Sequence, residues 1–198
     1  MYNKTFIIGI TGGTGCGKTT LLNCIAEQGG LILDCDEIYH RLLRTDDNLL
    51  LSIENRFPGV VENGVLQRQK LGNIVFSDEQ ALADLNKITH TAVKSEVLRQ
   101  LQPQPMLAAI DAIGLFEGGL AGLCDVTVAV TAPVEDRVRR LMARDGISEE
   151  YARKRIAAQR SSAEFSALCH HTLENNGDIG AFRTKCLAFL TEFGIMKV

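Results

Sequence analysis

The residues between Gly12 and Thr19 form the pattern G-x-x-x-x-G-K-T, whose spacing suits the binding of a phosphate chain. Glycines permit a tight turn in which successive backbone N–H groups point at phosphate oxygens. Lys18 can reach the β and γ phosphates, and the Thr19 hydroxyl can ligate Mg²⁺. We expect the phosphates on residues 12–20, with contacts from Gly13, Thr14, Gly15, Cys16, Gly17, Lys18, Thr19 and Thr20.

This pattern has a functional meaning only between a strand and a helix. The apolar stretch 6–10 precedes it and predicts a strand, while residues 21–26 predict a helix whose positive end adds to the phosphate site. The alternative is a glycine-rich turn followed by a chance Lys-Thr pair. The strand–turn–helix order favours the first interpretation, so the sequence predicts the binding of a nucleoside triphosphate.

Three aspartates lie where strands are predicted to end. Asp34 and Asp36 follow the short apolar run 31–33, which we expect to neighbour the strand before the glycine-rich turn, and Asp111 follows the run 106–110. A carboxylate there can organise Mg²⁺ or accept a hydroxyl proton, or it can simply cap the next helix. We expect one of Asp34 and Asp36 to do each, with Asp36 the functional one. Both interpretations of Asp111 stay open.

Arginines are concentrated in the last third of a chain whose formal net charge is −3. Most of them are explained as solvated helix faces. An arginine-rich helical hairpin before the last strand is nevertheless where a small-molecule kinase places its lid, which neutralises phosphoryl oxygens and excludes water. Within the segment we favour Arg140 and Arg155. Its arginines are Arg137, Arg139, Arg140, Arg144, Arg153, Arg155 and Arg160.

Two side chains in the long helical region are further candidates. His90 lies late in the helix that is predicted to follow Asp78, and Arg68 follows the turn at 62–65. An isolated histidine or arginine at such a place is more often an ordinary surface or core side chain than a ligand-binding one. From the residues alone, both interpretations stay open.

The order of strands and helices predicts an α/β fold: a P-loop kinase-like parallel sheet with helices on both faces, a helical substrate-binding insert and a helical lid. We treat residues 1–198 as one unit. Residues 46–102 are expected to be helical apart from the turn. The core comprises 1–36, 104–134 and 171–198, the insert about 37–103 and the arginine-rich lid region about 135–170.

Composition limits the partners. The net charge gives no basic field for nucleic acid or an anionic membrane, and no apolar run reaches membrane-spanning length. The six cysteines include no C-x-x-C pair, and the N-terminus has no signal-peptide pattern, so we expect reduced thiols and a cytoplasmic setting. We expect neither nucleic-acid nor membrane partners. The oligomeric state is open, with a monomer plausible.

Other nucleotide-binding classes fit less well. Asp111 to Gly114 matches the D-x-x-G motif of GTPases. GTPases also bind guanine with an N-K-x-D motif after a later strand, and this sequence has no such motif. The chain has two Asn-Lys pairs, and neither continues as x-Asp. The pair at 3–4 precedes the first strand and continues as Thr-Phe, and the pair at 86–87 lies in the helical region and continues as Ile-Thr. Ala112 stands where many motor ATPases place a glutamate to activate water. The sequence therefore supports neither of these classes.

Together, these motifs resemble the dephospho-coenzyme A kinase family from about residue 8 to 177. The glycine-rich loop is similar to the family's T-G-G-x-G-S-G-K-S, and residues 34–38 are similar to its D-A-D-x-I. The other segments that carry the resemblance are Gly64–Arg68 with Leu71 and Val75-Phe76, His90, Leu115–Glu117, Arg140 with Arg144-Asp145, Arg155–Gln159, and Asn175–Gly177.

The resemblance implies ATP-dependent phosphorylation of the ribose 3′-hydroxyl of dephospho-CoA, with ATP and Mg²⁺ required. It makes Asp36 the base, Lys18 and Arg140 the groups that stabilise the transferring phosphoryl, and Thr19 the metal-binding residue. Asn175 would lie near the adenine of ATP. The acceptor would contact Asp36 and three further residues, Arg68, His90 and Arg155.

The sequence also departs from the family pattern. Thr91 replaces a proline, Ile113-Gly114 replaces Pro-Leu, Phe165 stands where a lysine is common, and Cys169-His170 replaces Ala-Asp. These changes concern the acceptor pocket and the charge of the lid and leave the phosphate-binding residues intact. Two alternatives remain: a P-loop kinase for a nucleoside, nucleotide or shikimate-like alcohol, and a protein that uses a nucleotide as a binding switch.

Overall fold

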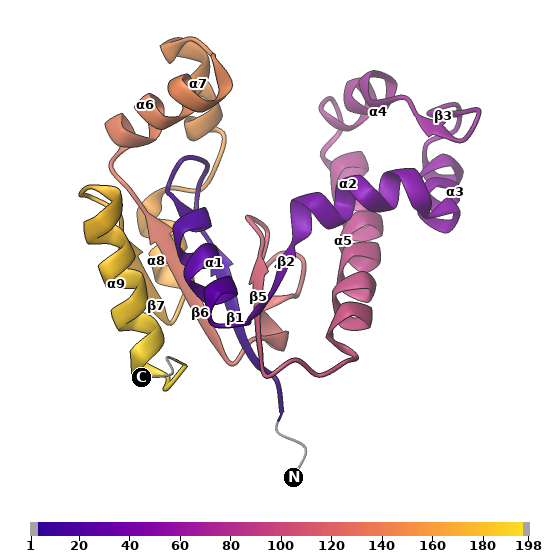
Figure 1. Ribbon diagram of the computed structural model, residues 1–198. Coiled ribbons are helices and arrows are strands. Elements are labelled where there is room, and N and C mark those ends of the chain that lie inside the picture. Colours follow the sequence, from indigo (N-terminus) through magenta and orange to yellow (C-terminus); the bar gives the residue numbers. More distant parts are fainter. Residues whose placement is uncertain (1–3, 196–198) are drawn as a thin grey trace.

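The computed structural model describes residues 4–195. Its centre is a five-stranded sheet in the order β2-β5-β1-β6-β7, with all neighbouring strands parallel (Figure 1). The loop after the central strand β1 opens at the carboxyl edge, where sheets of this kind bind ligands. The predicted parallel sheet is confirmed. The strands are β1 (Phe6–Thr11), β2 (Leu31–Asp34), β5 (Leu107–Asp111), β6 (Val126–Thr131) and β7 (His171–Glu174).

The strand order corrects one expectation. β2 pairs with β5, with Asp34 opposite Asp111, and does not pair with β1. β5 pairs with β1, with Ile10 opposite Asp111. The strand beside the glycine-rich loop therefore ends in Asp111, and Asp34 lies one strand further out. β5 is buried at every position but its last, as befits an inner strand, whereas most of β2 is only partly buried.

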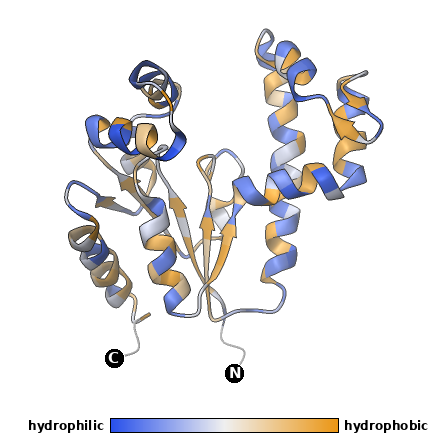
Figure 2. Ribbon diagram, turned by 45° about the horizontal axis from the view of Figure 1, so that its top comes forward, coloured by the Kyte–Doolittle hydropathy of each residue, from blue (hydrophilic) through white to orange (hydrophobic). Residues whose placement is uncertain are grey.

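Each face of the sheet has its own apolar core. Side chains alternate along a strand, so Ile8 and Ile10 of β1 point to one face and Ile7 to the other. The first face is covered by α1 (Lys18–Glu27) and α9 (Ile179–Glu192), which also pack against each other. The helices that follow β2 share the core of the second face. Figure 2 shows the apolar strands between helices that are hydrophilic on their outer sides.

The segment between β2 and β5 is mostly helical, with one exception. A hairpin of β3 (Val61–Glu62) and β4 (Val65–Leu66) interrupts it, which corrects the expectation of an all-helical region. The hairpin turns at Asn63 and Gly64, whose φ angles are 51° and 75°, and Asn-Gly is the pair that favours such turns. The helices are α2 (Cys35–Thr45), α3 (Asp47–Arg56), α4 (Arg68–Val75) and α5 (Glu79–Leu101).

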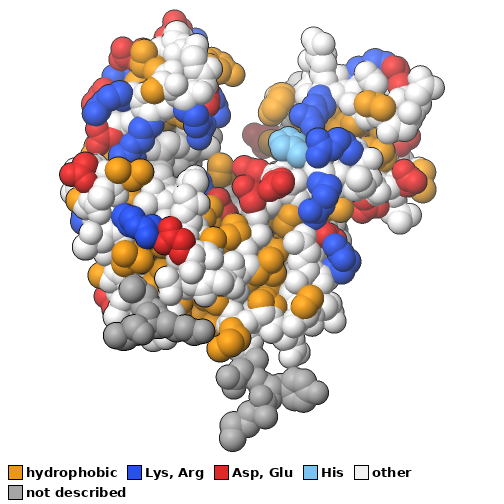
Figure 3. All heavy atoms as spheres, in the orientation of Figure 1, with side chains coloured by type: hydrophobic (Ala, Val, Ile, Leu, Met, Phe, Trp, Pro, Cys, Tyr) orange, Lys and Arg blue, Asp and Glu red, His pale blue; other side chains and the backbone are white. Residues whose placement is uncertain are grey.

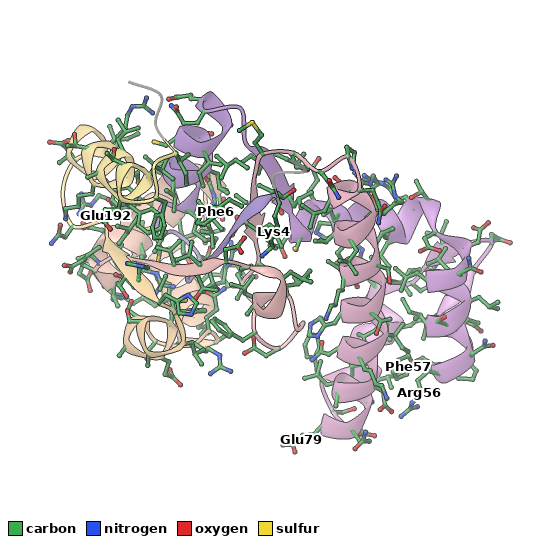
Figure 4. The ribbon with its side chains drawn as sticks, turned by 90° about the horizontal axis from the view of Figure 1, so that it is seen from below. Lys4, Phe6, Arg56, Phe57, Glu79 and Glu192 are labelled. Carbon is green, nitrogen blue, oxygen red and sulfur yellow. The ribbon has the colours of Figure 1, made fainter. Side chains whose placement is uncertain are left out.

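α5 is the longest helix of this segment, and side chains fix both its start and its neighbour. Asp78 caps it as predicted, accepting hydrogen bonds from two N–H groups of the first turn. Near this end, the Arg56 guanidinium lies 4.8 Å from the centre of the Phe57 ring and donates to Asp84 of α5 at 2.7 Å (Figure 4). The bond from Arg56 to Asp84 connects α3 to α5 at this end of the segment.

Three helices lie between β6 and β7: α6 (Val134–Asp145), α7 (Glu149–Ala157) and α8 (Ser162–Leu168). α6 and α7 form an arm with a small apolar core of its own, which includes Val138 and Ile156 (Figure 1). Ser148 caps α7, and α8 is a helix that the sequence analysis did not predict. Its start is a capping box of Ser161 and Glu164. Across residues 4–195, no helix is both long and apolar enough to cross a membrane.

Candidate active site

The loop between β1 and α1 has the backbone that the glycine pattern predicts. Gly17 is the N-cap of α1 with φ 95°, a left-handed conformation that costs glycine little. Gly12 passes so close to β6 that a Cβ on it would lie 2.2 Å from the Val130 carbonyl oxygen. A side chain at either position would force the loop out of shape. The helix start leaves N–H groups without partners inside the helix, facing the space above the loop.

Side chains from distant parts of the chain bind the carbonyl groups of this loop. Arg137 Nε donates to Thr14 O at 2.8 Å, and Arg140 Nη1 donates to Gly15 O at 3.1 Å. The buried Asn175 donates to Cys16 O at 2.9 Å. Because N–H and C=O point in opposite directions in a trans peptide, the next N–H groups turn away from these side chains. The amides that turn away from Arg137 and Asn175 in this way are those of Gly15 and Gly17, whereas Cys16 N donates to Gly13 O at 3.3 Å.

A cleft of about 700 Å³ lies over the loop. Figure 3 shows it as a hollow between the α6–α7 arm and the α2–α5 segment, with acidic groups on its floor and basic groups on both sides. The structure brings the predicted Asp36, Arg140 and Arg155 to its wall. Its polar lining consists of Thr14–Thr19, Asp36, Asp111, Arg140, Arg144, Arg155 and Gln159.

The two aspartates after β2 have different positions. Asp34 caps α2, accepting from the N–H groups of Asp36 and Glu37 at 2.9 and 3.0 Å. Asp36 is in the first turn of α2 and lines the cleft. The expected capping role is therefore confirmed for one aspartate of the pair, and the other lies where a base would have to be. The catalytic role of Asp36 stays a prediction.

Asp111 is the most unusual carboxylate of the site. Its Oδ1 atom is buried and, among the described residues, has no hydrogen-bond partner. Lys18 Nζ lies 3.9 Å from it and donates to Gly12 O at 3.0 Å. Burial raises the pKa of Asp111 to about 6; Lys18 opposes this, and the charges of Asp34 and Asp36 add to it. A buried, unsatisfied oxygen beside Lys18 favours the functional interpretation of this residue.

A second pocket, of about 160 Å³, adjoins the cleft at Asp36 and Ile113. It is largely apolar, with Tyr39, Val93 and Leu120 in its wall, and His90 also lines it. The structure thus brings Asp36 and His90 together, although 54 positions separate them in the sequence. The two pockets therefore lie next to each other, with Asp36 and Ile113 in the walls of both.

Other predicted residues lie elsewhere. Arg68 lines neither the cleft nor the second pocket; its Nη2 lies 3.3 Å from His40 Nδ1, and its charge acts on Tyr39, whose pKa is raised mainly by burial. Asn175 lies behind the loop and accepts from Arg140 at 3.2 Å. Its predicted contact with adenine is not tested by this arrangement. Arg155 lines the cleft while it donates to Asp145 at 2.7 Å.

The departures from the family pattern lie at different distances from the cleft. Ile113 and Gly114 line the second pocket, where they shape the space beside Asp36. His170 accepts from Thr127 N at 3.1 Å, near the start of β6 and so at the opposite end of the strand from the cleft. Phe165 is a buried residue of α8 itself. Of these changed residues, Ile113 and Gly114 are the ones that line the second pocket.

The sequence analysis missed two contributors. Arg137 is buried behind the loop and Gln159 accepts from Thr14 N at 2.8 Å. Both occur in segments that the analysis singled out, one among the arginines and one at the end of a family-like motif. Their partners could not be identified, because they lie 123 and 145 positions away in the sequence.

A parallel sheet with this loop at its carboxyl edge, a helix starting from the loop and a basic arm over the cleft define a P-loop kinase fold. Solved structures share it. The shikimate kinase from Acinetobacter baumannii covers 97% of the chain with a TM-score of 0.54 at 20% identity, a likeness of fold. The match to the Thermus thermophilus protein TT1252 covers 96% of this chain and 98% of the TT1252 chain, with a TM-score of 0.80 at 34% identity.

Sequence comparison gives the particular family. The dephospho-CoA kinase family model matches residues 6–181. The dephospho-CoA kinase of Geobacillus kaustophilus is 34% identical over 98% of this chain and 99% of its own. That of Latilactobacillus sakei is 33% identical over 91% of this chain and 92% of its own. The chain belongs to the dephospho-CoA kinase family, whose members are phosphotransferases.

Proposed function

We propose that the protein transfers the γ-phosphoryl group of ATP to the ribose 3′-hydroxyl of dephospho-CoA, forming CoA and ADP, the last step of coenzyme A biosynthesis. One observation carries the proposal beyond family membership. Asp36 lines both the cleft over the phosphate loop and the adjoining second pocket. A carboxylate between a triphosphate and an acceptor pocket is where a kinase needs its base.

In the proposed reaction, the 3′-oxygen forms a bond to the γ-phosphorus while the bond to the β–γ bridging oxygen breaks. The hydroxyl proton passes to the Asp36 carboxylate, and ADP leaves. Lys18 and Arg140 stabilise the charge on the phosphoryl oxygens, because both lie at the loop that holds the phosphates. Arg155 exchanges its bond to Asp145 for the substrate when the arm closes and excludes water.

The residues present fit a Mg²⁺ ion. Thr19 and the unsatisfied, buried Asp111 Oδ1 both line the cleft. Within residues 4–195, no cluster of three His, Cys, Asp or Glu side chains forms a complete metal cage. This suits Mg²⁺, which usually binds to one or two protein oxygens and completes its shell with phosphates and water. When bound, it would neutralise developing phosphate charge; Thr19 and Asp111 would hold it.

On the acceptor side, His90 contacts the substrate in the second pocket, and Arg68 reaches it from α4 as the segment closes. We propose that the insert of about 37–103 holds dephospho-CoA and that the arm of about 135–170 covers ATP, whose adenine lies on the side of Asn175. We also propose that the protein works in the cytoplasm on a small-molecule substrate, without nucleic acid or a membrane as a partner.

A coupled assay of ADP release tests this function. With ATP and Mg²⁺, we expect ADP release to depend on dephospho-CoA, and mass spectrometry to find CoA as the product. Pantetheine phosphate, which lacks the ribose hydroxyl, is the matched control and should give no stimulation. Shikimate and nucleosides serve as acceptors for the alternative kinase class. ADP release that is indifferent to dephospho-CoA would overturn the proposal.

A further inference from the structure

Arg137 is a buried cation behind the phosphate loop. It is 2% exposed, and within residues 4–195 no carboxylate lies at ion-pair distance from it. Other arginines of the same arm, such as Arg139, Arg153 and Arg155, each pair with a carboxylate. A buried charge without a counterion is costly, so a residue of this kind needs a compensating partner.

The partners that Arg137 does have are one carbonyl group of the loop and one side chain of the arm. Its Nε donates to Thr14 O at 2.8 Å, and its Nη2 lies 3.4 Å from Gln159 Oε1. The same Gln159 oxygen accepts from Thr14 N at 2.8 Å. Thr14 is therefore held on both its C=O and its N–H, by two side chains that also contact each other.

The contact between Arg137 and the loop is close enough to depend on glycines. A Cβ on Gly13 would lie 2.3 Å from Arg137 Nη2, and a Cβ on Gly15 would lie 3.1 Å from the Arg137 carbonyl oxygen. The guanidinium therefore fills the space directly behind the turn. Since α6 carries Arg137 and Gln159 follows α7, the arm and the loop are joined at this point.

We propose that Arg137 is a positioning residue for nucleotide binding, acting with Gln159. It fixes the Thr14 peptide, which keeps the neighbouring amides in place, and its charge behind the loop is compensated by the triphosphate when ATP binds. The proposal rests on the nucleotide half of the proposed function. It does not depend on which acceptor is phosphorylated.

The test is the Kd of Mg-ATP, measured by calorimetry without any acceptor, on the full-length protein. Arg137→Met, which fills similar space without charge or donors, should raise the Kd by about 10- to 100-fold, the loss expected for a charged hydrogen-bonding group. Arg137→Lys keeps the charge but loses the fork and should weaken binding less. Gln159→Ala should raise the Kd by about 3- to 10-fold, as for a neutral hydrogen bond.

Arg139→Gln is the matched control: it removes a charge from the same helix, at an exposed side chain that pairs with Asp136. Its Kd should stay within twofold of wild type. In the folded Arg137→Met protein, KM for ATP should rise while KM for the acceptor, at saturating ATP, does not. An unchanged ATP Kd in Arg137→Met would overturn the proposal. If that variant does not fold, an unchanged Kd in Gln159→Ala would overturn it equally.

Discussion

The nucleotide side and the acceptor side of the cleft are built in different ways. The nucleotide side is one continuous segment, Gly12–Thr19, whose carbonyls are bound by side chains more than 120 positions away in the sequence. The acceptor side joins single residues of separate elements, such as Asp36, His90 and Ile113, around a small and mostly apolar pocket. Hydrogen bonds hold the nucleotide side in place, whereas the acceptor side is defined by the shape of its pocket.

This difference matches what each side must do. Stabilising the charge of a transferring phosphoryl group requires dipoles that are already oriented, because reorganising them during the reaction would cost free energy. The acceptor side must instead recognise a neutral hydroxyl and exclude water. Arg155, in the lining of the cleft, is held by Asp145 and exposed enough to change partners. We therefore expect substitutions on the two sides to affect different kinetic constants.

The largest effect is expected at Asp36, where the two sides meet. Asp36→Asn removes the proton acceptor without changing the size of the side chain. We expect kcat to fall by about 10²- to 10⁴-fold, the range for loss of a general base, while the Kd of ATP changes little. Steady-state kinetics with dephospho-CoA, together with ATP calorimetry, would measure both.

Asp34→Asn is the control for this variant, because Asn also caps helices well and the position lies outside the cleft lining. It should leave kcat within about threefold of wild type. Equal losses in the two variants would mean that Asp36 acts through the helix start of α2. An unchanged kcat in Asp36→Asn would contradict its role as the base.

The same contrast explains what the sequence could reveal. The phosphate loop was predictable, because its chemistry requires glycines, Lys18 and Thr19 at fixed spacing within one segment. The cap at Asp34 and the strand ends were predictable for the same local reason. The position of β5 between β1 and β2 was not, since strand order depends on packing across the sheet and leaves no local pattern. The functional environment of Asp111 followed from that order.

Two other differences have local causes. The hairpin at Asn63-Gly64 carries a recognisable turn signal. Its strands are only two residues long, which is too short to show an alternation of apolar and polar residues. The role of Arg137 had no such signal. Arg139 and Arg140 lie within three positions of it, and only the structure separates the arginine that is buried against the loop from one such as Arg139 that is paired at the surface.

The next largest effect is expected at Asp111, on the nucleotide side of the cleft, and it concerns the stability of the fold. The folded-state pKa of Asp111 is about 6, above the usual carboxyl value, so the folded protein holds its proton more tightly than the unfolded chain does. Stability is therefore lost as pH rises from about 4 to about 6. Asp111→Asn should have a free energy of unfolding higher than wild type by ~1–3 kcal/mol at pH 8.

Urea denaturation in EDTA, without nucleotide, would measure this difference, which should shrink toward zero near pH 4. The same variant should lose phosphotransfer activity, because it removes an oxygen proposed to hold Mg²⁺. A gain in stability with a loss of activity is the signature of a site in which burial works against folding. A variant that is less stable than wild type at pH 8 would show that Asp111 is a structural residue.

The smallest effect is expected at His90, on the acceptor side alone. His90→Ala enlarges the second pocket and removes one polar contact, so the KM for dephospho-CoA should rise by about 3- to 10-fold, as for one neutral hydrogen bond. The Kd of ATP should not change, because His90 does not line the cleft over the loop. Thr91→Ala, one position along α5 and exposed, is the control and should match wild type. If His90→Ala weakened ATP binding as much as acceptor binding, the two sides would be coupled, and the separation between a fixed nucleotide side and an independent acceptor side would be wrong.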